Sequence, residues 1–303
     1  MKSIIKQIIK LSGLSIALLF ISYLILRFSP FVSPETNALL IVLISLLALF
    51  SGKYFWNRFR RYIQYRSAKP VDSSNVKISE EKIFLITGAN RGIGLALVKE
   101  LIAMGHTIIA TARDLSTSQK LSELSPKVFI LDVSDNKSIE SFSKKIADQK
   151  IDYLINNAVE GPVNQRIAEL HIDGLEKAFQ TNVIGVCKLI QCLLPNLQKS
   201  SEKKIINISS DLGSFNRMNP CLLYGYQTSK AALNMLTLLL SKELSPKGFC
   251  CLAIHPGPVN TRLNPEGVLS TEESAKAIIN VISQLKKSDS GKWFDYKGKI
   301  VPW

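Results

Sequence analysis

A chain of 303 residues with 46% hydrophobic residues can bury the core of one large α/β domain and carry an appendage. The net charge of +14 is uneven, because residues 1–80 hold eleven lysines and arginines against three acidic residues. These basic residues flank apolar runs, which favours a membrane-topology signal over a nucleic-acid-binding surface. The five cysteines form no CxxC pair and no His/Cys cluster has zinc spacing, so we expect no metal site and buried, reduced thiols.

The first predicted elements are two apolar helices. Apolar runs at 11–26 and 38–50 are separated by a segment with two prolines. Each run is shorter than the roughly 20 residues that cross a hydrocarbon core, but apolar flanks extend the spans to about 8–28 and 37–56. Neither run has a polar face, which disfavours soluble helices. No small-x-small cleavage site follows the first run, which disfavours a cleaved signal peptide.

The charges around these two runs predict their orientation. Lysines precede the first run and arginines follow the second, whereas the connecting loop carries only Arg27 and Glu35. By the positive-inside tendency, both ends lie in the cytoplasm. We therefore predict a hairpin over 1–65 that anchors the chain in a lipid bilayer, with the rest facing the cytoplasm; a re-entrant or monotopic hairpin stays open. A polar linker is expected at 66–80.

From Lys82 onward, strand-like and helix-like segments alternate. Strands are expected at 83–86, 107–111, 128–131, 153–155, 204–209 and 249–254. Helices are expected at 92–104, 136–148, 172–197, 226–244 and 271–285. This alternation predicts an α/β domain over 81–303, a doubly wound parallel sheet with helices on both faces.

A glycine-rich turn links the first expected strand to the first helix of this domain. Its glycines permit a tight turn and a close approach of the backbone, and the helix N-terminus offers N–H groups and a positive dipole to a pyrophosphate. The spacing differs from GxGxxG, so the turn alone also fits an ordinary strand-to-helix connection. The residues expected to contact a dinucleotide here are Gly88, Asn90, Arg91, Gly92, Ile93 and Gly94.

Tyr226 and Lys230 lie four residues apart, on one face of an expected helix. The positive charge favours the phenolate, so the tyrosine can exchange a proton near neutral pH. Taken alone, such a pair occurs on many solvated helices. Beside a hydride carrier it is the equipment of a carbonyl reductase or an alcohol dehydrogenase.

Five motifs occur in an order that resembles the signature of the classical short-chain dehydrogenase/reductase family over about residues 82–303. The matching motifs are Thr87–Gly94, Asn156–Ala158, Ser210, Tyr226 with Lys230, and Pro256–Gly257. The features most similar to carbonyl reductase-like and C-factor-like members are Ala110–Asp114, His255–Gly257 and Ile300–Trp303. The resemblance implies a Rossmann fold and an NAD(P)-dependent oxidoreductase.

The resemblance also implies catalytic roles. Tyr226 would be the general acid in reduction and the general base in oxidation, and Lys230 would bind the nicotinamide ribose and lower the pKa of Tyr226. Ser210 would polarise the substrate carbonyl, while Ser209 would point to the other side of its strand. Asn182 would hold a water of the proton relay.

Two arginines indicate which of the two nicotinamide cofactors is preferred. Arg113 ends the second expected strand and Arg91 lies in the glycine turn, so both can clamp the 2′-phosphate of NADP. Asp114 is the counter-argument, because an acidic residue at a strand end binds the ribose hydroxyl of NAD. We predict that NADP(H) is preferred, with NAD(H) left open.

Further cofactor contacts are implied by the resemblance alone. Asp132 would face the adenine, although it could equally cap a helix. Asn157 and Ala158 would line a ribose. Val259 and Thr261 lie in the segment that would flank the nicotinamide amide.

Two departures from the family pattern put the shape of the pocket in doubt. Val159 stands where a glycine is usual, and Pro258 stands where a tryptophan is frequent. We predict a membrane-anchored oxidoreductase that transfers a hydride between NADP(H) and a carbonyl or alcohol substrate, a hydrophobic ketone or aldehyde. The alternative is a non-catalytic NADP(H)-binding redox sensor or membrane scaffold. A homodimer stays open, because helices such as 172–197 and 226–244 pair subunits in many family members.

Overall fold

The computed structural model describes residues 78, 80–114, 116, 119–124, 127–161, 167–216 and 223–303. The chain divides between Pro70 and Val71 into two units, and all of the described residues belong to the second. The predicted membrane hairpin and nearly all of the predicted linker lie outside the described residues. Within the described ranges, no helix combines the length and the apolar character that a membrane crossing requires.

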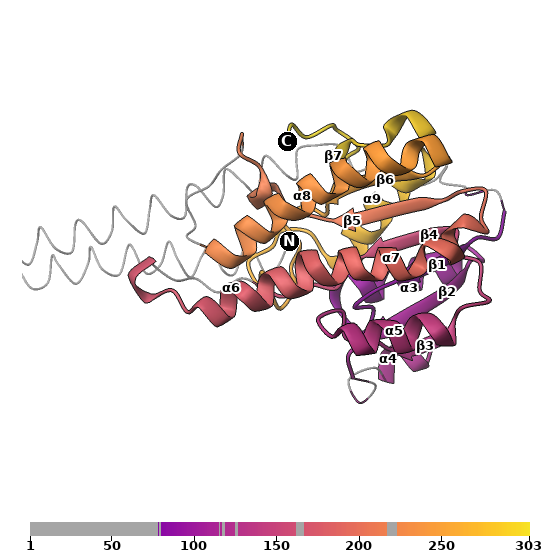
Figure 1. Cartoon of the computed structure of the whole chain (residues 1–303), viewed down its shortest axis with the longest axis horizontal. Coiled ribbons are helices and arrows are strands. Elements are labelled where there is room, and N and C mark those ends of the chain that lie inside the picture. Colours follow the sequence, from indigo (N-terminus) through magenta and orange to yellow (C-terminus); the bar gives the residue numbers. More distant parts are fainter. Residues whose placement is uncertain are drawn as a thin grey trace, which may run out of the picture. The chain divides into compact units, whose positions relative to one another are not determined.

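One sheet of seven parallel strands, in the order β3-β2-β1-β4-β5-β6-β7, runs through the described part of the chain (Figure 1). The strands are β1 (Ile83–Ile86), β2 (Thr107–Ala112), β3 (Lys127–Ile130), β4 (Tyr153–Asn156), β5 (Lys204–Ile208), β6 (Cys250–His255) and β7 (Trp293–Asp295). The chain winds outward from β1 to β3 and then returns to β4 beside β1. This is the doubly wound parallel sheet that was predicted, and the reversal between β1 and β4 opens the crevice in which such sheets bind ligands.

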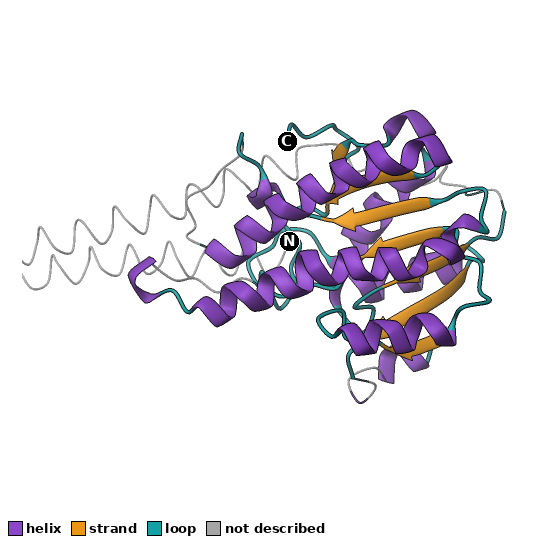
Figure 2. Cartoon of the chain, viewed as in Figure 1, coloured by secondary structure: helices purple, strands orange, loops and turns teal. Residues whose placement is uncertain are grey.

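Helices cover both faces of the sheet (Figure 2). The helices are α3 (Gly92–Ala103), α4 (Gln119–Ser122), α5 (Asn136–Lys145), α6 (Ile172–Phe179), α7 (Gly185–Gln198), α8 (Tyr224–Leu244) and α9 (Thr271–Ser283). Because side chains alternate along a strand, Phe84 and Ile86 enter the core beneath α3 and α9, whereas Leu85 enters the core beneath α5, α7 and α8. All three side chains are fully buried, as expected for a parallel sheet covered on both sides.

The expected helix over 172–197 contains a change of geometry. A π-helical segment, Gln180–Ile184, separates α6 from α7. Directly after it, Gly185 packs so tightly that a Cβ atom would lie 1.8 Å from the carbonyl oxygen of Val133. Strand β7 was not predicted, because three residues are too few to show an alternating pattern.

Candidate active site

The glycine turn between β1 and α3 depends on its glycines. Gly88 and Gly92 have φ angles of 62° and 56°, in the left-handed region where L side chains are strained. Gly94 packs so closely that a Cβ atom would lie 2.4 Å from the carbonyl oxygen of Gly88. Arg91 occupies the N-cap of α3 in an extended conformation and makes no capping hydrogen bond among the described residues. The turn therefore offers the first N–H groups of α3 to an anion.

A hydrogen-bond network fixes the segment after β4 against this turn. The side-chain amide of Asn157 donates to the carbonyl oxygens of Thr87 and Gly88, at 2.9 and 3.0 Å. The hydroxyl oxygen of Thr87 accepts hydrogen bonds from the backbone N–H groups of Asn157 and Ala158, both at 3.0 Å. The ends of β1 and β4 are thus held together at the switch point of the sheet.

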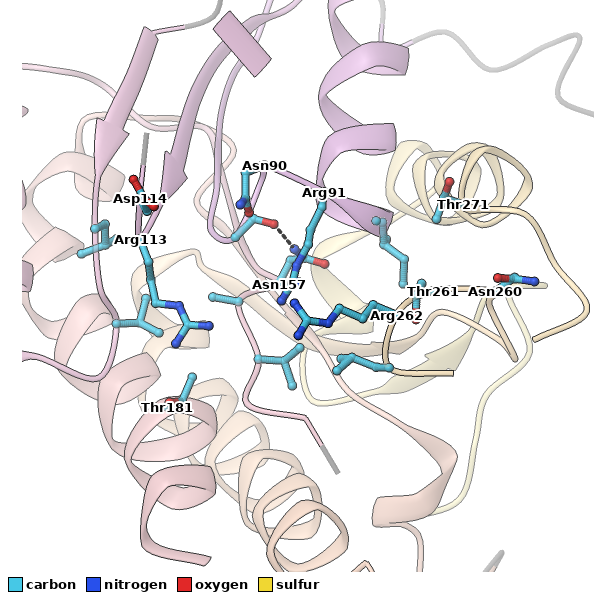
Figure 3. Close-up of a pocket in the computed structure, with 18 residues that line it drawn as sticks. Asn90, Arg91, Arg113, Asp114, Asn157, Thr181, Asn260, Thr261, Arg262 and Thr271 are labelled. Carbon is cyan, nitrogen blue, oxygen red and sulfur yellow. Dashed lines mark hydrogen bonds between the residues drawn. The ribbon is translucent and has the colours of Figure 1, made fainter. Parts of the chain in front are cut away.

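A cavity of about 700 Å³ opens beside the turn (Figure 3). This volume lies within the range of roughly 300–1,000 Å³ that is usual for small-molecule sites. The predicted cofactor residues that line it are Gly88, Asn90, Arg91, Gly92, Ile93, Arg113, Asn157, Ala158 and Thr261. Of the remaining predictions, Gly94 lies beneath the turn, Val259 is buried in a bridge to Leu269, and Tyr226 and Lys230 lie outside this lining.

Asp132 is engaged in the turn that follows β3. Its carboxylate accepts hydrogen bonds from the backbone N–H and the hydroxyl group of Ser134, at 2.9 and 2.7 Å. The N-cap of α5 is Asp135 rather than Asp132. Leu131 and Val133, on either side of Asp132, line the cavity, so this stretch presents apolar side chains to the cavity.

The charge of the cavity is positive. Arg91, Arg113 and Arg262 direct their side chains into it (Figure 3). Asp114 is the one acidic residue among the described residues of the lining. Its carboxylate accepts hydrogen bonds from the backbone N–H and hydroxyl groups of Ser116, which lower the pKa of Asp114. Since Asp114 is turned toward Ser116, the arginines dominate the surface that faces a ligand.

Tyr226, Lys230 and Ser210 meet at the carboxyl end of β5. Tyr226 and Lys230 both lie on α8, and the ammonium nitrogen of Lys230 is 5.7 Å from the centre of the Tyr226 ring. The side chain of Ser210 is hydrogen-bonded to Tyr226 and accepts a hydrogen bond from the backbone N–H of Leu212 at 3.2 Å. Ser209 points away and donates to Asn234. The structure thus places the predicted catalytic serine, and not its neighbour, beside the tyrosine.

Burial sets the proton affinities of this group. It raises the pKa of Tyr226 to about 12, and the hydrogen bond with Ser210 offsets only part of that rise. Burial also lowers the pKa of Lys230 to about 7, and its nitrogen donates to the carbonyl oxygen of Ile208 at 2.7 Å. The lowering of the Tyr226 pKa by Lys230, expected above, is therefore not seen between these protein groups. Loss of hydration on burial is the largest cause of both shifts.

Asn182 lies in the π-helical segment, a geometry that is frequent at functional sites. Its side-chain oxygen accepts a hydrogen bond from the backbone N–H of Glu160 at 2.8 Å. Its side-chain nitrogen donates to the carbonyl oxygen of Glu160 at 3.2 Å and to the hydroxyl of Ser229 at 3.0 Å. Asn182 thereby joins α8, at the residue before Lys230, to the segment that follows β4.

The segment that follows Ser210 is braced from a distant part of the chain. Ser214 donates a hydrogen bond to the carbonyl oxygen of Pro302 at 3.2 Å, and Asn216 donates to that of Trp303 at 3.3 Å. The Trp303 ring stacks on the fully buried Trp293 of β7, with centroids 5.6 Å apart. These contacts were not predicted from the sequence, because they depend on strand β7, which was not predicted either.

Several residues of the cavity were also missed. They are Leu131, Val133, Val159, Thr181, Asn260, Arg262, Leu263 and Thr271. Most of them adjoin a residue that was predicted, so a broader reading of each motif would have found them. One feature of the sequence could have indicated Arg262, because it is a positively charged residue directly after Thr261, a predicted cofactor contact.

Comparisons with known proteins agree with this geometry. A family described as short chain dehydrogenase matches residues 82–273. An uncharacterized oxidoreductase of Schizosaccharomyces pombe is 32% identical over 249 residues, covering 73% of this chain and 98% of the relative. An NADPH-dependent pterin aldehyde reductase of Arabidopsis thaliana is 32% identical over 203 residues, covering 65% of this chain and 82% of the relative.

Among solved structures, an NADPH-bound carbonyl reductase from chicken fatty liver superimposes with a TM-score of 0.68 and 32% sequence identity. The match covers 74% of this chain and 100% of the reductase chain. The similarity therefore extends over nearly the whole of the described domain.

Proposed function

The chain belongs to the short chain dehydrogenase family, and we propose that it transfers a hydride between NADP(H) and a carbonyl or alcohol group with Tyr226 as the acid and base. It is an NAD(P)-dependent oxidoreductase with a preference for NADP(H). The observation that carries the proposal is the meeting of Ser210, Tyr226 and Lys230 at the carboxyl end of the sheet.

The cavity fits a phosphorylated dinucleotide on its own geometry. Side chains at Gly88 or Gly94 would collide with Ala158 or with the carbonyl oxygen of Gly88 and displace the turn beside the N-terminus of α3, where a pyrophosphate is stabilised by free N–H groups. Arg91 and Arg113 supply positive charge that suits a 2′-phosphate. Asp114, the residue that would favour NAD, is bound by its own neighbour. The NADP(H) preference predicted from the two arginines therefore has a structural reason.

The proton chemistry follows from the surroundings of Tyr226. When bound, NADPH would supply the hydride. A pKa of about 12 keeps the phenol protonated at neutral pH, so Tyr226 is ready to donate a proton to a carbonyl oxygen that gains negative charge. Ser210, in contact with the phenol, is placed to donate a hydrogen bond to the same oxygen and to polarise the carbonyl. Lys230, with a pKa of about 7, can gain or lose a proton near neutrality and so help to restore Tyr226.

The remaining assignments concern structure around these groups. We assign to Asn182 the positioning of α8 against the segment after β4, through its contacts with Glu160 and Ser229. The water-holding role of Asn182 and the adenine contact of Asp132 stay predictions. Exposed apolar side chains on and beside α7 and α8, namely Ile184, Met235 and Leu239, support pairing of two copies through these helices.

The sequence supports a finer version of this function. The apolar runs within 1–65 and their basic flanks favour a membrane anchor whose attached enzyme faces the cytoplasm. An anchor of this kind concentrates the site near lipid-soluble molecules. We therefore assign the substrate to the hydrophobic ketones and aldehydes.

The test is a substrate screen with a tyrosine variant. The purified protein should consume NADPH with a member of a panel of sterols, retinoids and fatty aldehydes. Tyr226→Phe should lower kcat by about 10²–10⁴-fold, while the Kd for NADPH, followed by cofactor fluorescence, should stay nearly constant. Tyr224→Phe is the matched control, because Tyr224 lies two residues away and is not hydrogen-bonded to Ser210 in the described contacts.

Two results would contradict the proposal. One is NADPH binding without turnover across the whole panel. The other is full turnover by Tyr226→Phe. A Tyr226→Phe protein that retains its complete cellular role would instead favour the redox-sensor or scaffold alternative.

A further inference from the structure

The loop between β6 and α9 is held in a defined shape at one wall of the cavity. Gly267 packs against the start of the loop so closely that a Cβ atom would lie 2.1 Å from the carbonyl carbon of Val259. Further along, Thr261 and Asn264 exchange backbone hydrogen bonds of 3.2 and 3.1 Å. These contacts present Arg262 and Leu263 together at the tip of the loop.

Leu263 packs this tip of the loop against the opposite wall of the cavity. One methyl carbon of Leu263 lies 2.4 Å from the position that a Cβ atom of Gly161 would occupy. A glycine at 161 therefore leaves the space that Leu263 fills, and the tip reaches from its own loop to the segment after β4. Arg262, the adjacent residue, is held over the cavity between the two walls.

Arg262 and Arg91 enter the cavity from different directions (Figure 3). Arg91 comes from the glycine turn and Arg262 from the loop tip, and both guanidinium groups point toward the space beside Asn157. Two like charges that share a cavity repel each other, whereas an anion between them is attracted by both. Asp114, the acidic residue of the described lining, accepts hydrogen bonds from Ser116, and neither Arg91 nor Arg262 forms an ion pair with another described residue.

The positions of the arginines indicate which phosphate each one binds. Arg113 follows β2, the place at which a sheet of this type meets the adenosine ribose and a 2′-phosphate. Arg262 instead lies beside the N-terminus of α3, where a pyrophosphate meets unpaired N–H groups, because the side chain of the adjacent Thr261 comes within 3.9 Å of the position that a Cβ atom of Gly92 would occupy. A guanidinium also suits this task, because it can donate two parallel hydrogen bonds to one phosphate.

We propose that Arg262 binds the pyrophosphate of the dinucleotide from the loop side and holds it over the glycine turn, while Arg91 and Arg113 serve the 2′-phosphate. This inference rests on the proposed function, because it requires a dinucleotide in the cavity. It adds a residue outside the five motifs and makes the β6–α9 loop part of the cofactor site. The packing of Leu263 on Gly161 is the positioning contact that keeps Arg262 in place.

The test separates the two phosphate sites by comparing NADPH with NADH, since both contain the pyrophosphate and only NADPH carries the 2′-phosphate. The Kd for each nucleotide is measured by cofactor fluorescence for the wild type, Arg262→Ala and Arg113→Ala. Arg262→Ala should raise both Kd values by about tenfold or more and by the same factor, as expected for loss of a charged hydrogen bond. Arg113→Ala should raise the Kd for NADPH more than the Kd for NADH.

Two further variants control for charge and geometry. Lys287→Ala removes one positive charge from an exposed site outside the cavity lining, and it should leave both Kd values unchanged. Arg262→Lys keeps the charge but loses the paired donors, and it should give intermediate values. Unchanged Kd values in Arg262→Ala, or a change confined to NADPH, would overturn the assignment of Arg262 alone. A wild-type protein that binds neither nucleotide would overturn the proposed function as well.

Discussion

The arginines of the cavity and the lysine of the proton-transfer group carry the same formal charge in different surroundings. Arg91, Arg113 and Arg262 reach into an open cavity, and Arg113 also lies 3.9 Å from the carboxylate of Glu160. Lys230 is only 3% exposed, and its pKa falls to about 7. Guanidinium groups keep their charge in either setting, whereas a buried ammonium can release its proton. One region is therefore suited to hold an anion, and the other to move a proton.

The largest expected effect tests the burial of Lys230. Its pKa is about 7 in the folded chain and 10.5 as the ordinary value. Between these values the unfolded chain holds a proton that the folded chain has released, so the free energy of unfolding of the wild type rises with pH. Lys230→Met lacks this dependence. Relative to the variant, the wild type should gain about 3 kcal/mol of stability between about pH 7 and pH 9.5.

Urea unfolding of both proteins at several pH values measures this difference. The raised pKa of Tyr226 acts in the opposite direction only above its ordinary value of 10.0, so it does not interfere below that pH. Lys287→Met, at an exposed position, is the control and should follow the wild type. If the free energy of unfolding depends on pH in the same way for the wild type and Lys230→Met, Lys230 keeps its charge in the folded chain. The contrast between a neutral buried lysine and the charged arginines would then disappear.

A smaller effect concerns the shape of the cofactor region rather than its charge. In Gly94→Ala the added methyl group would lie 2.4 Å from the Gly88 carbonyl oxygen and 2.6 Å from the side-chain nitrogen of Asn157. The turn must shift, at a cost of roughly 1–3 kcal/mol in stability. We expect NADPH binding to weaken by more than tenfold, measured by fluorescence titration. Gly174→Ala, which meets nothing within 4 Å, should leave binding unchanged.

An unchanged Kd in Gly94→Ala would mean that the dinucleotide does not rest on this turn. Gly94→Ala also tests whether the cofactor cavity and the proton-transfer group act separately. Turnover at saturating NADPH should survive in Gly94→Ala, because Tyr226 and Ser210 lie on other elements.

The predictable parts of this molecule are those that short sequence patterns determine. Strand β1 consists of four apolar residues, three of them buried, and glycines suited to a tight turn follow it, so both strand and turn were visible in the sequence. The neighbourhood of Tyr226 and Lys230 follows in the same way from a helical spacing of four residues.

What the sequence could not reveal depends on contacts between distant segments. The π-helical segment adjoins Gly185, whose packing on Val133 joins two separate loops. The place of Arg262 depends on Leu263 reaching Gly161, about a hundred residues away in sequence. The pKa of Lys230 depends on the number of neighbours that exclude water, which no four-residue motif records.

The smallest expected effect tests the brace between Trp303 and the segment that follows Ser210. Trp303→Ala removes the ring that stacks on Trp293, an interaction worth about 0.5–1.5 kcal/mol beyond the area it buries. The hydrogen bond from Asn216 to the backbone at Trp303 then loses its fixed acceptor, and Ser210 becomes less well positioned. We expect kcat to fall several-fold while the Kd for NADPH stays constant, because the brace lies beside the proton-transfer group and not in the cavity lining. Trp303→Phe keeps an aromatic ring and should restore most of the rate. Equal losses in Trp303→Ala and Trp303→Phe, or a loss of NADPH binding in either, would show that Trp303 acts on the domain as a whole and not through Ser210.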